Sequence, residues 1–457
     1  MRSRSEWLVG FLSNHSVGAM TWPQGFRGTF LFTGSIALLD QLLVSGTNFL
    51  TALLVGRLCG PEELGFYSLG FSIAIVVLGL QESLIVSPYI HFRGRFEGRS
   101  LTDYSGAALL SSALLSLPVV LGLLLGGTVW HLSRASQMGV LLWVMAAAVP
   151  FLVLREFGRR FHFSNLQSKR SLRLDAVTVG LQLGFLGALV ALDWFSALNA
   201  LLSAGLACAV TGLAWLFRRR NQFGLNRQGW VPAARRNWNF GKWIWAAQMI
   251  YYLKSEILIL WLLAFILGEA ATGVFAACLA VVYLSNPFVL GIGQILSPWI
   301  KQALDREGQA GMRQLIHRTA AGLAVPMAGF CLLLMLFGQD MLAIFYGEAF
   351  GRRQGVIVVL GLSVLTAVLG MAPRAGLSAL GRPDLRFKTD LTGSVLGVSC
   401  SAWLISSWEL LGVACGLWVG HLVATGLQWL RLFELTREGT DSVLQQTGAK
   451  QEFIPKT

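Results

Sequence analysis

Four charged side chains stand inside long apolar segments of this sequence, where charge is costly. Asp40 lies near the middle of the first apolar segment, Glu82 near the end of the second, and Lys254 and Glu256 at the midpoint of the seventh. An ionised side chain at the centre of a bilayer costs about 2.5–3.5 kcal/mol on insertion scales, so each one needs a reason to be there. Binding an ion or a charged substrate is the chemistry that these groups suggest.

Asp40 belongs to a polar stripe along the first segment. Steps of seven and eleven residues return to nearly the same face of a helix, so Thr33, Asp40, Thr47 and Thr51 align, with Gln41 and Asn48 beside them. A stripe of this length favours a helix face that lines a wet cleft. The alternative is hydrogen bonding between helices by small polar residues.

The seventh segment has a polar stripe of its own, formed by Gln248, Tyr252 and Ser255. Lys254 and Glu256 are two residues apart, about 200° around a helix, so they cannot share a face, and Glu256 lies nearer to the stripe. The candidate residues for binding a substrate or an ion in the cleft are therefore Asp40, Gln41, Asn48, Glu82, Gln248, Tyr252, Lys254 and Glu256.

Lys254 has two possible roles. It could be a cation in the cleft that binds phosphate, or a buried partner of Asp40 or Glu82 that ties the first segment to the seventh. Both roles are compatible if such a pair opens when a diphosphate arrives. The second half of the chain has no acid that matches Glu82, an asymmetry that suits a site for proton or sodium coupling.

Basic residues and acids also recur in two matched loops. With an offset of 215 positions, Arg159 corresponds to Arg374 and Asp175 to Asp390. Arginine–aspartate pairing at these places could lock the cytoplasmic ends of two halves together, and transport would then have to break it. The alternative is that the arginines only belong to two ordinary basic loops.

The elements that position these residues are membrane helices. The chain is 54% hydrophobic and 13% charged, its mean hydropathy is +0.61, and soluble domains contain roughly 25% charged residues. Twelve apolar segments are long enough to cross about 30 Å of hydrocarbon as helices. We expect them near residues 30–57, 64–90, 103–130, 136–157, 174–193, 195–217, 241–266, 270–300, 312–337, 354–373, 387–408 and 410–431. The sequence thus predicts an all-α polytopic membrane protein.

The distribution of charge predicts the orientation. All but five of the 36 Lys and Arg residues fall on one side if both termini are cytoplasmic, as the positive-inside rule requires. The exceptions are Arg57, Arg134, Arg352 and Arg353 on the outside and Lys254 within a span. The net charge of +13 therefore reflects membrane topology, and we expect no nucleic acid partner.

An internal repeat divides the chain. Gly60–Tyr67 resembles Gly268–Phe275 at an offset of 208, and Ser87–Ile90 resembles Ser297–Ile300 at an offset of 210. Six spans separate the copies, so the two lobes should have the same orientation, as parallel repeats do. The expected parts are a cytoplasmic N-terminal segment (1–29), an N-lobe of six helices (30–217), a basic cytoplasmic linker (218–240), a C-lobe of six helices (241–432) and a cytoplasmic tail (433–457).

The sequence lacks the patterns of an enzyme. No glycine-rich nucleotide loop precedes a lysine, and no cluster of metal ligands appears. The six cysteines lie in or beside spans without paired spacing, which is typical of small buried apolar residues. We therefore expect neither catalysis, nor a cofactor, nor a bound metal.

Three motifs resemble those of a known family. Leu58–Leu69 (LCGPEELGFYSL) looks like the signature after the first span of bacterial polysaccharide biosynthesis transporters of the O-antigen flippase type. Ala379–Asp384 (ALGRPD) is similar to the loop after their tenth span, and Phe345–Phe350 (FYGEAF) to the external loop before it. The resemblance covers roughly residues 30–435. It implies the multidrug, oligosaccharidyl-lipid and polysaccharide exporter superfamily, with two six-helix lobes around a V-shaped central cleft.

The resemblance implies a function and its partners. The protein would be a bacterial inner-membrane flippase that moves an oligosaccharide on a polyprenyl diphosphate across the membrane by alternating access, for polysaccharide such as lipopolysaccharide or exopolysaccharide. Partners would be the lipid-linked oligosaccharide, anionic lipids, a proton or sodium ion, and other membrane proteins of polysaccharide assembly. The residues expected to capture the head group or to form the cytoplasmic gate are Arg93, Arg95, Arg159, Arg160, Asp175, Arg374 and Asp390.

An ion-coupled multidrug exporter on the same fold is the alternative. Such a protein would need acids in the cleft and few cations that bind phosphate. The intramembrane acids Asp40, Glu82 and Glu256 do outnumber the single intramembrane lysine, Lys254.

Overall fold

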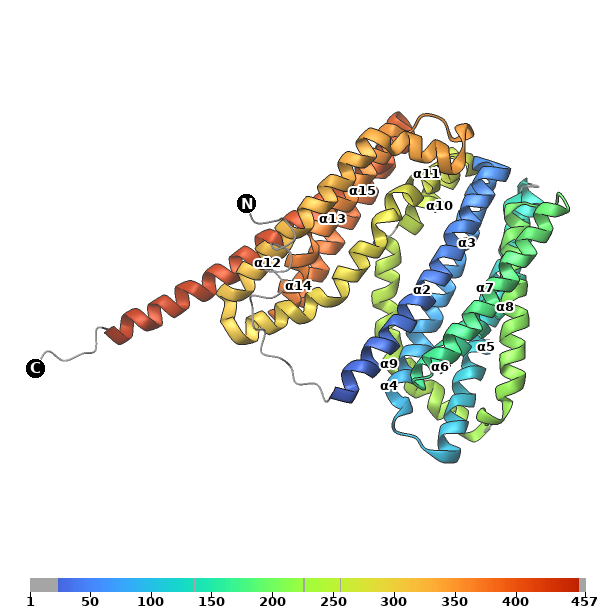
Figure 1. The fold of residues 1–457 in the computed structure, drawn as a ribbon, viewed down its shortest axis with the longest axis horizontal. Helices are drawn as coiled ribbons and strands as arrows, with labels where there is room; N and C mark the ends of the chain where they lie inside the picture. The colour runs from blue at the N-terminus through green and yellow to red at the C-terminus, as the bar shows by residue number, and fades with distance from the viewer. Residues whose placement is uncertain (1–23, 135–136, 225–226, 255, 452–457) are drawn as a thin grey trace, which may run out of the picture.

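The computed structural model describes residues 24–134, 137–224, 227–254 and 256–451, and these ranges consist of helices and short connections (Figure 1). No strand occurs within them. The fold class predicted from composition is thus confirmed. The expected N-terminal segment, 1–29, lies almost wholly outside the described residues.

The first half of the chain forms one helical bundle. Its elements are α2 (Gln24–Cys59), α3 (Pro61–Gln81), the π-helical turn η1 (Glu82–Val86), α4 (Ser87–Arg93), α5 (Gly98–Arg134), α6 (Gln137–Ser164), α7 (Ser168–Ala191), α8 (Ala197–Arg219) and the 3-10 turn η2 (Arg220–Gln222). Proline starts α3, where its missing N–H is harmless, and Ser196 caps α8 by accepting a hydrogen bond from the Asn199 backbone.

The second half forms another bundle, and two of its helical segments are much longer than those of the first half. Its elements are α9 (Arg227–Lys254), α10 (Glu256–Leu267), α11 (Glu269–Val282), η3 (Tyr283–Ser285), α12 (Asn286–Tyr346), η4 (Glu348–Phe350), α13 (Gln354–Leu369), α14 (Met371–Ala379) and α15 (Pro383–Gln451). Two of these segments contain a break where the backbone is not helical, α12 at Gly308 and α15 at Glu409. Figure 1 shows α12 turning back on itself, so that it supplies the end of one membrane crossing and the whole of the next.

The described helices accommodate the twelve expected spans. Ten segments are long and apolar enough to cross a membrane, and the last of them, Pro383–Arg437, contains the break at Glu409 and supplies two crossings. The apolar helix α10 is shorter, and together with the end of α9 it supplies the seventh crossing. The protein is therefore a multi-pass helical membrane protein.

The two bundles share a core at one end only. Buried side chains of both halves, for example Leu64 and Phe275, belong to one cluster at the end where Gly60 and Gly268 lie. At the opposite end there are two separate cores. One joins N-lobe residues such as Ile85 to Ala233 at the start of α9, and the other lies between Leu296 and Leu432. We name these the outer and inner ends, after the expected orientation. In Figure 1 the bundles meet at the outer end and diverge toward the inner end.

The repeated glycines make the outer contact. Gly60 and Gly268 precede α3 and α11 with nearly the same backbone conformation, φ 90° and 87°, a left-handed region that favours glycine. One turn further on, a methyl group on Gly65 would collide with the carbonyl of Glu269, and one on Gly273 with the carbonyl of Pro61. The two copies of the motif therefore pack against each other, backbone to backbone.

The expected basic linker, 218–240, is largely helical, since α9 begins at Arg227. The first part of α9 packs on the N-lobe: Asn237 accepts a hydrogen bond from the Tyr104 hydroxyl at 2.8 Å, and Arg236 lies over the Phe96 ring at 5.2 Å. A Cβ on Gly241 would lie 2.6 Å from the Ser83 carbonyl oxygen in η1. Within the described residues, most of the connection between the lobes is thus a helix packed on the N-lobe.

Candidate functional site

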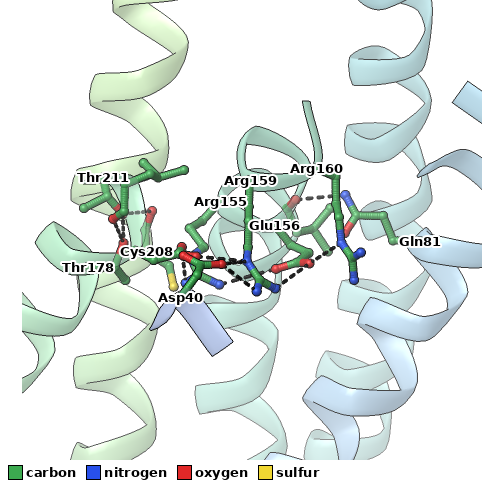
Figure 2. A network of polar contacts seen from close by, with 12 residues as sticks. Asp40, Gln81, Arg155, Glu156, Arg159, Arg160, Thr178, Cys208 and Thr211 are labelled. Atoms are coloured by element: carbon green, nitrogen blue, oxygen red, sulfur yellow. Dashed lines mark hydrogen bonds and ion pairs between the residues drawn. The ribbon is translucent and has the colours of Figure 1, made fainter. Parts of the chain in front are cut away.

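Arg159 of α6 lies at the centre of a buried ionic network in the N-lobe. Its Nη2 is 3.0 Å from Asp40 Oδ2 of α2, and its Nε is 2.9 Å from Asp175 Oδ2 of α7. Arg155, one turn earlier, also pairs with Asp175, through its Nη2. The side chains of Asp40 and Asp175 are essentially inaccessible, at 1% and 0%. Figure 2 shows Arg155 and Arg159 pointing into one cluster with Asp40.

Glu156 joins this cluster to the surface. Its Oε1 is 2.8 Å from Arg160 Nε and 3.5 Å from Arg159 Nη1, and its Oε2 is 3.3 Å from Arg155 Nη1 (Figure 2). Arg160 is 3.4 Å from Glu82 Oε2, and both of these side chains are about one-third exposed. Sequence reasoning missed Arg155 and Glu156, although the spacing of four residues between Glu156 and Arg160 is a typical signal for a pair on one helix face.

The polar stripe on α2 lies inside the N-lobe. Asp40, Thr47 and Thr51 are buried; the two threonines bond back to carbonyls four residues earlier, and Gln182 of α7 donates to Thr51 Oγ1 at 3.3 Å. The stripe therefore serves contacts between helices, and the expectation that this face lines a wet cleft is wrong for its buried members. The physical reason is that α7 and α6 cover it with polar groups of their own.

The flanking residues of the stripe point elsewhere. Gln41 is exposed and donates to Ser45 Oγ at 3.0 Å, and Asn48 is half-buried. The side chain of Thr33 lies outside the described residues. A role of Gln41 or Asn48 in binding remains a prediction.

A smaller ionic cluster occupies the matching place in the C-lobe. Arg374 Nη2 of α14 is 3.5 Å from Asp390 Oδ1 of α15, and Arg386 Nε is 4.0 Å from Asp390 Oδ2. Gln428, which is fully buried, donates to Asp390 Oδ1 at 2.9 Å. The repeat-related pairs Arg159–Asp175 and Arg374–Asp390 thus both form within a lobe. The expectation that these pairs lock the two lobes together is wrong, because each aspartate lies near the start of a helix that packs beside the helix of its own arginine.

The seventh crossing contacts the N-lobe through Tyr252. This side chain is buried and its hydroxyl donates to the Ile75 carbonyl of α3 at 3.0 Å. Gln248 is half-buried one turn earlier, and Glu256 is half-buried at the first position of α10. The side chain of Lys254 lies outside the part that the structure describes, so its pairing stays a prediction. Asp40 and Glu82, its expected partners, each pair with an arginine of α6.

Two further arginines lie at the inner end of the N-lobe. Arg93 donates to the Ser164 carbonyl at 3.0 Å and to the Asn165 side chain, which fastens the end of α4 to the end of α6. Arg95 is exposed and lies over the Phe92 ring at 5.0 Å. Arg95 is the freer of the two to attract an anion. Within the described ranges, no group of three or more His, Cys, Asp and Glu is arranged to hold a metal ion.

Solved structures with the same arrangement are transporters. An inward-facing multidrug resistance MATE family transporter of the MOP superfamily aligns with a TM-score of 0.70, at 16% identity over 89% of this chain and 96% of that chain. An outward-facing transporter of the same family gives 0.59, at 15% identity over 91% and 96%. The MATE transporter VcmN of Vibrio cholerae gives 0.58, at 17% identity over 91% and 98%. The chain therefore has the MATE-like transporter fold.

The comparison with curated protein sequences finds a match over a smaller part of the chain. The capsular polysaccharide biosynthesis protein CapF of Staphylococcus aureus is 22% identical over 158 residues, which is 34% of this chain and 40% of that protein. The match thus spans less than half the length of the relative. No family model matches the chain.

Proposed function

We propose that this protein is a flippase that moves a polyprenyl-diphosphate-linked oligosaccharide across the inner membrane by alternating access. The observation that carries the proposal is the arrangement of cores: the two repeat halves share buried side chains at the outer end and have separate cores at the inner end. Such halves can rock about each other. The similarity to CapF, a capsular polysaccharide biosynthesis protein, supports the substrate class.

The arrangement corresponds to an inward-facing state. The TM-score is higher with the inward-facing MATE transporter than with the outward-facing one, and the outer contact between Gly65 and Gly273 is closed. Exposed arginines at the inner end, such as Arg95 and Arg386, would attract a diphosphate head group from the leaflet. The sugar would then follow between the lobes while the lipid tail stays in the bilayer.

The N-lobe network supports ion coupling. Its ion pairs join four carboxylates (Asp40, Glu82, Glu156 and Asp175) to three guanidinium groups (Arg155, Arg159 and Arg160). One negative charge is therefore uncompensated when all are ionised, and a buried charge of this kind attracts a proton or a small cation. An ion that crosses with the membrane potential supplies about 2.3 kcal/mol per charge per 100 mV.

Deletion of the gene in the native host tests the proposal. We expect loss of a surface glycan and accumulation of its lipid-linked oligosaccharide on the cytoplasmic side, because synthesis continues when translocation stops. Lipid extraction with mass spectrometry and glycan staining provide the measurements. Restoration by the wild-type gene is the control. Unchanged glycan together with unchanged lipid-linked intermediates would refute the flippase proposal.

A multidrug exporter is the second candidate function. The fold is shared with MATE transporters described as multidrug resistance proteins, and the N-lobe network is rich in acids. The same deletion strain separates the two: an exporter predicts new sensitivity to cationic drugs with intact glycan. A flippase predicts the reverse.

A further inference from the structure

The two ionic clusters differ in a way that the repeat makes visible. At the offset of 215, Arg159 and Asp175 keep their types as Arg374 and Asp390, but Glu156 becomes Met371. At the offset of 208 that relates the first span to the seventh, Asp40 becomes Gln248. The C-lobe thus lacks two of the acids that surround the arginine–aspartate pair shared by both lobes.

The other substitutions change the basic residues. Arg155 becomes Gly370 and Arg160 becomes Ala375, while Ser171, a buried residue of the N-lobe, becomes the exposed Arg386. Arg386 is therefore a cation that the N-lobe does not have at that place. It comes four residues before Asp390, on the same face of α15.

The charges of the C-lobe cluster do not balance. Arg374 and Arg386 share one carboxylate, that of Asp390, at 3.5 and 4.0 Å. Among the described residues, the ion pairs of the N-lobe network join four carboxylates to three guanidinium groups, whereas those of this cluster join two guanidinium groups to one carboxylate. Two guanidinium groups held near each other by a single carboxylate form a site that favours a further anion.

The arginines of the cluster have donors available for an anion. Arg386 Nη1 makes only a long contact of 3.4 Å with Ser378 Oγ, and the Ser378 hydroxyl itself donates to the Arg374 backbone carbonyl at 3.0 Å. Arg374 Nε is buried without a hydrogen-bond partner in the described part of the chain. The side chains of Arg374 and Arg386 are 30% and 48% exposed, so an anion can reach them.

The connection between α14 and α15 holds these groups at the inner end. The chain reverses at Gly381, whose φ is 71°, and the Arg382 backbone N–H bonds to the Leu377 carbonyl at 3.0 Å. The Arg382 side chain pairs with Asp384, to which it donates two hydrogen bonds of 3.1 Å. Of these neighbouring arginines, Arg374 and Arg386 are the pair with spare charge.

We propose that Arg374 and Arg386 form a phosphate-binding site in the C-lobe that receives the diphosphate of the transported lipid. This assignment rests on the proposed function. It gives the coupling cation and the anionic diphosphate separate binding places, one in each lobe. The acid-rich N-lobe cluster takes the cation, and the base-rich C-lobe cluster takes the anion. Asp390 holds the two arginines in place when no ligand is bound.

Binding to the purified full-length protein in phosphatidylcholine nanodiscs tests the site. The probes are undecaprenyl diphosphate, inorganic diphosphate and phosphatidylglycerol, measured by native mass spectrometry or thermophoresis. Arg374→Gln and Arg386→Gln should each weaken binding of undecaprenyl diphosphate about tenfold or more, the effect of one lost charge-assisted hydrogen bond. Arg382→Gln removes the same charge from the same connection and should leave binding within about twofold, since Asp384 already engages that side chain.

A further variant guards against a merely structural effect. Asp390→Asn removes the carboxylate that competes with phosphate for the arginines and keeps an acceptor for Gln428, so it should tighten binding. Weaker binding in this variant, or equal losses in Arg382→Gln and Arg386→Gln, would overturn the proposal.

The three probes distinguish the sources of phosphate. Undecaprenyl diphosphate should compete with inorganic diphosphate for the site, and phosphatidylglycerol should displace neither. Displacement of both by phosphatidylglycerol would make the site a general lipid contact and would overturn its role in transport. This binding test is independent of glycan export: arginine-dependent binding with unchanged glycan in the deletion strain would refute the proposed function and leave the phosphate site standing.

Discussion

At the scale of single residues, Arg159 is the side chain that pairs with the buried carboxylates of three helices. Two inaccessible carboxylates, on α2 and α7, depend on its guanidinium group, and Glu156 lies on its other side. A buried ion pair adds little net stability, but the removal of one partner is costly because it leaves the other charge without compensation. We therefore expect Arg159 to be a structural cation, and the partly exposed Arg160 to be the better candidate for contact with a substrate.

Arg159→Gln should lower the stability of the protein by about 3–5 kcal/mol, the usual cost of breaking a buried ionic pair. Thermal unfolding of the detergent-solubilised protein measures the change. Arg160→Gln, whose side chain is 37% exposed, is the matched control on the same helix and should cost less than about 1 kcal/mol.

A double variant shows whether the lost charge is the reason. Adding Asp40→Asn to Arg159→Gln removes the carboxylate that loses its arginine, while Asp175 keeps its pair with Arg155, so part of the stability should return. Equal unfolding temperatures for Arg159→Gln and Arg160→Gln, or no recovery in the double variant, would contradict the assignment.

At the scale of elements, close helix packing positions the C-lobe cluster. The two halves of α15, before and after Glu409, lie backbone to backbone through glycines. A Cβ on Gly420 would be 2.8 Å from the Gly393 carbonyl oxygen and 3.0 Å from Gly397 Cα. Small residues allow such approach between membrane helices. This packing brings Gln428, from the second half, to Asp390 in the first half.

Gly420→Val should therefore separate the halves of α15 and destabilise the protein by a few kcal/mol, about the range for overpacking in a tight core. Gly426→Val lies on the same helix, where an added Cβ meets nothing within 4 Å, and should change stability by less than about 1 kcal/mol. Fluorescence-detected thermal unfolding in detergent compares them. Equal unfolding temperatures for the two variants would show that the close packing of these glycines does not contribute to stability.

At the scale of the whole molecule, the outer contact between the lobes is the place that the proposed transport cycle must open. α3 and α11 meet there through the two copies of the glycine motif. Arg57 extends the contact by donating to the carbonyls of Ile344 and Phe345 at the end of α12. A contact made of backbone and glycine can close tightly and open again without breaking buried ion pairs.

Gly65→Val should hold this contact open, because its side chain would occupy the place of the Glu269 carbonyl. Cys278 of α11, fully buried in the shared core, should then react with a maleimide at least about tenfold faster. The measurement uses protein whose other five cysteines have been replaced. Gly122→Val, at a position with nothing within 4 Å, is the control. Unchanged labelling of Cys278 in Gly65→Val would refute the role of this contact as the outer seal.

Much of the architecture follows from the sequence because its causes are local. The length and apolarity of each segment decide that it crosses a membrane as a helix. The glycines at 60, 65, 268 and 273 reveal the repeat and mark where the lobes touch. The offset of 215 identified the residues of both arginine–aspartate pairs, although not that each pair stays within one lobe.

What only the tertiary structure decided is which charges meet. Periodicity assigns Asp40 to a helix face, but whether that face meets water or another helix depends on how α2 is rotated against α6 and α7. Arg159 lies 119 positions away in the sequence, so no local pattern could reveal their contact, nor the part played by Glu156. The sequence by itself determined a membrane protein of two like-oriented halves, since hydrophobicity and repetition are properties of the chain. The sign of the charge that we propose for each half depends on packing, because a buried charge is defined by the neighbours that fold around it.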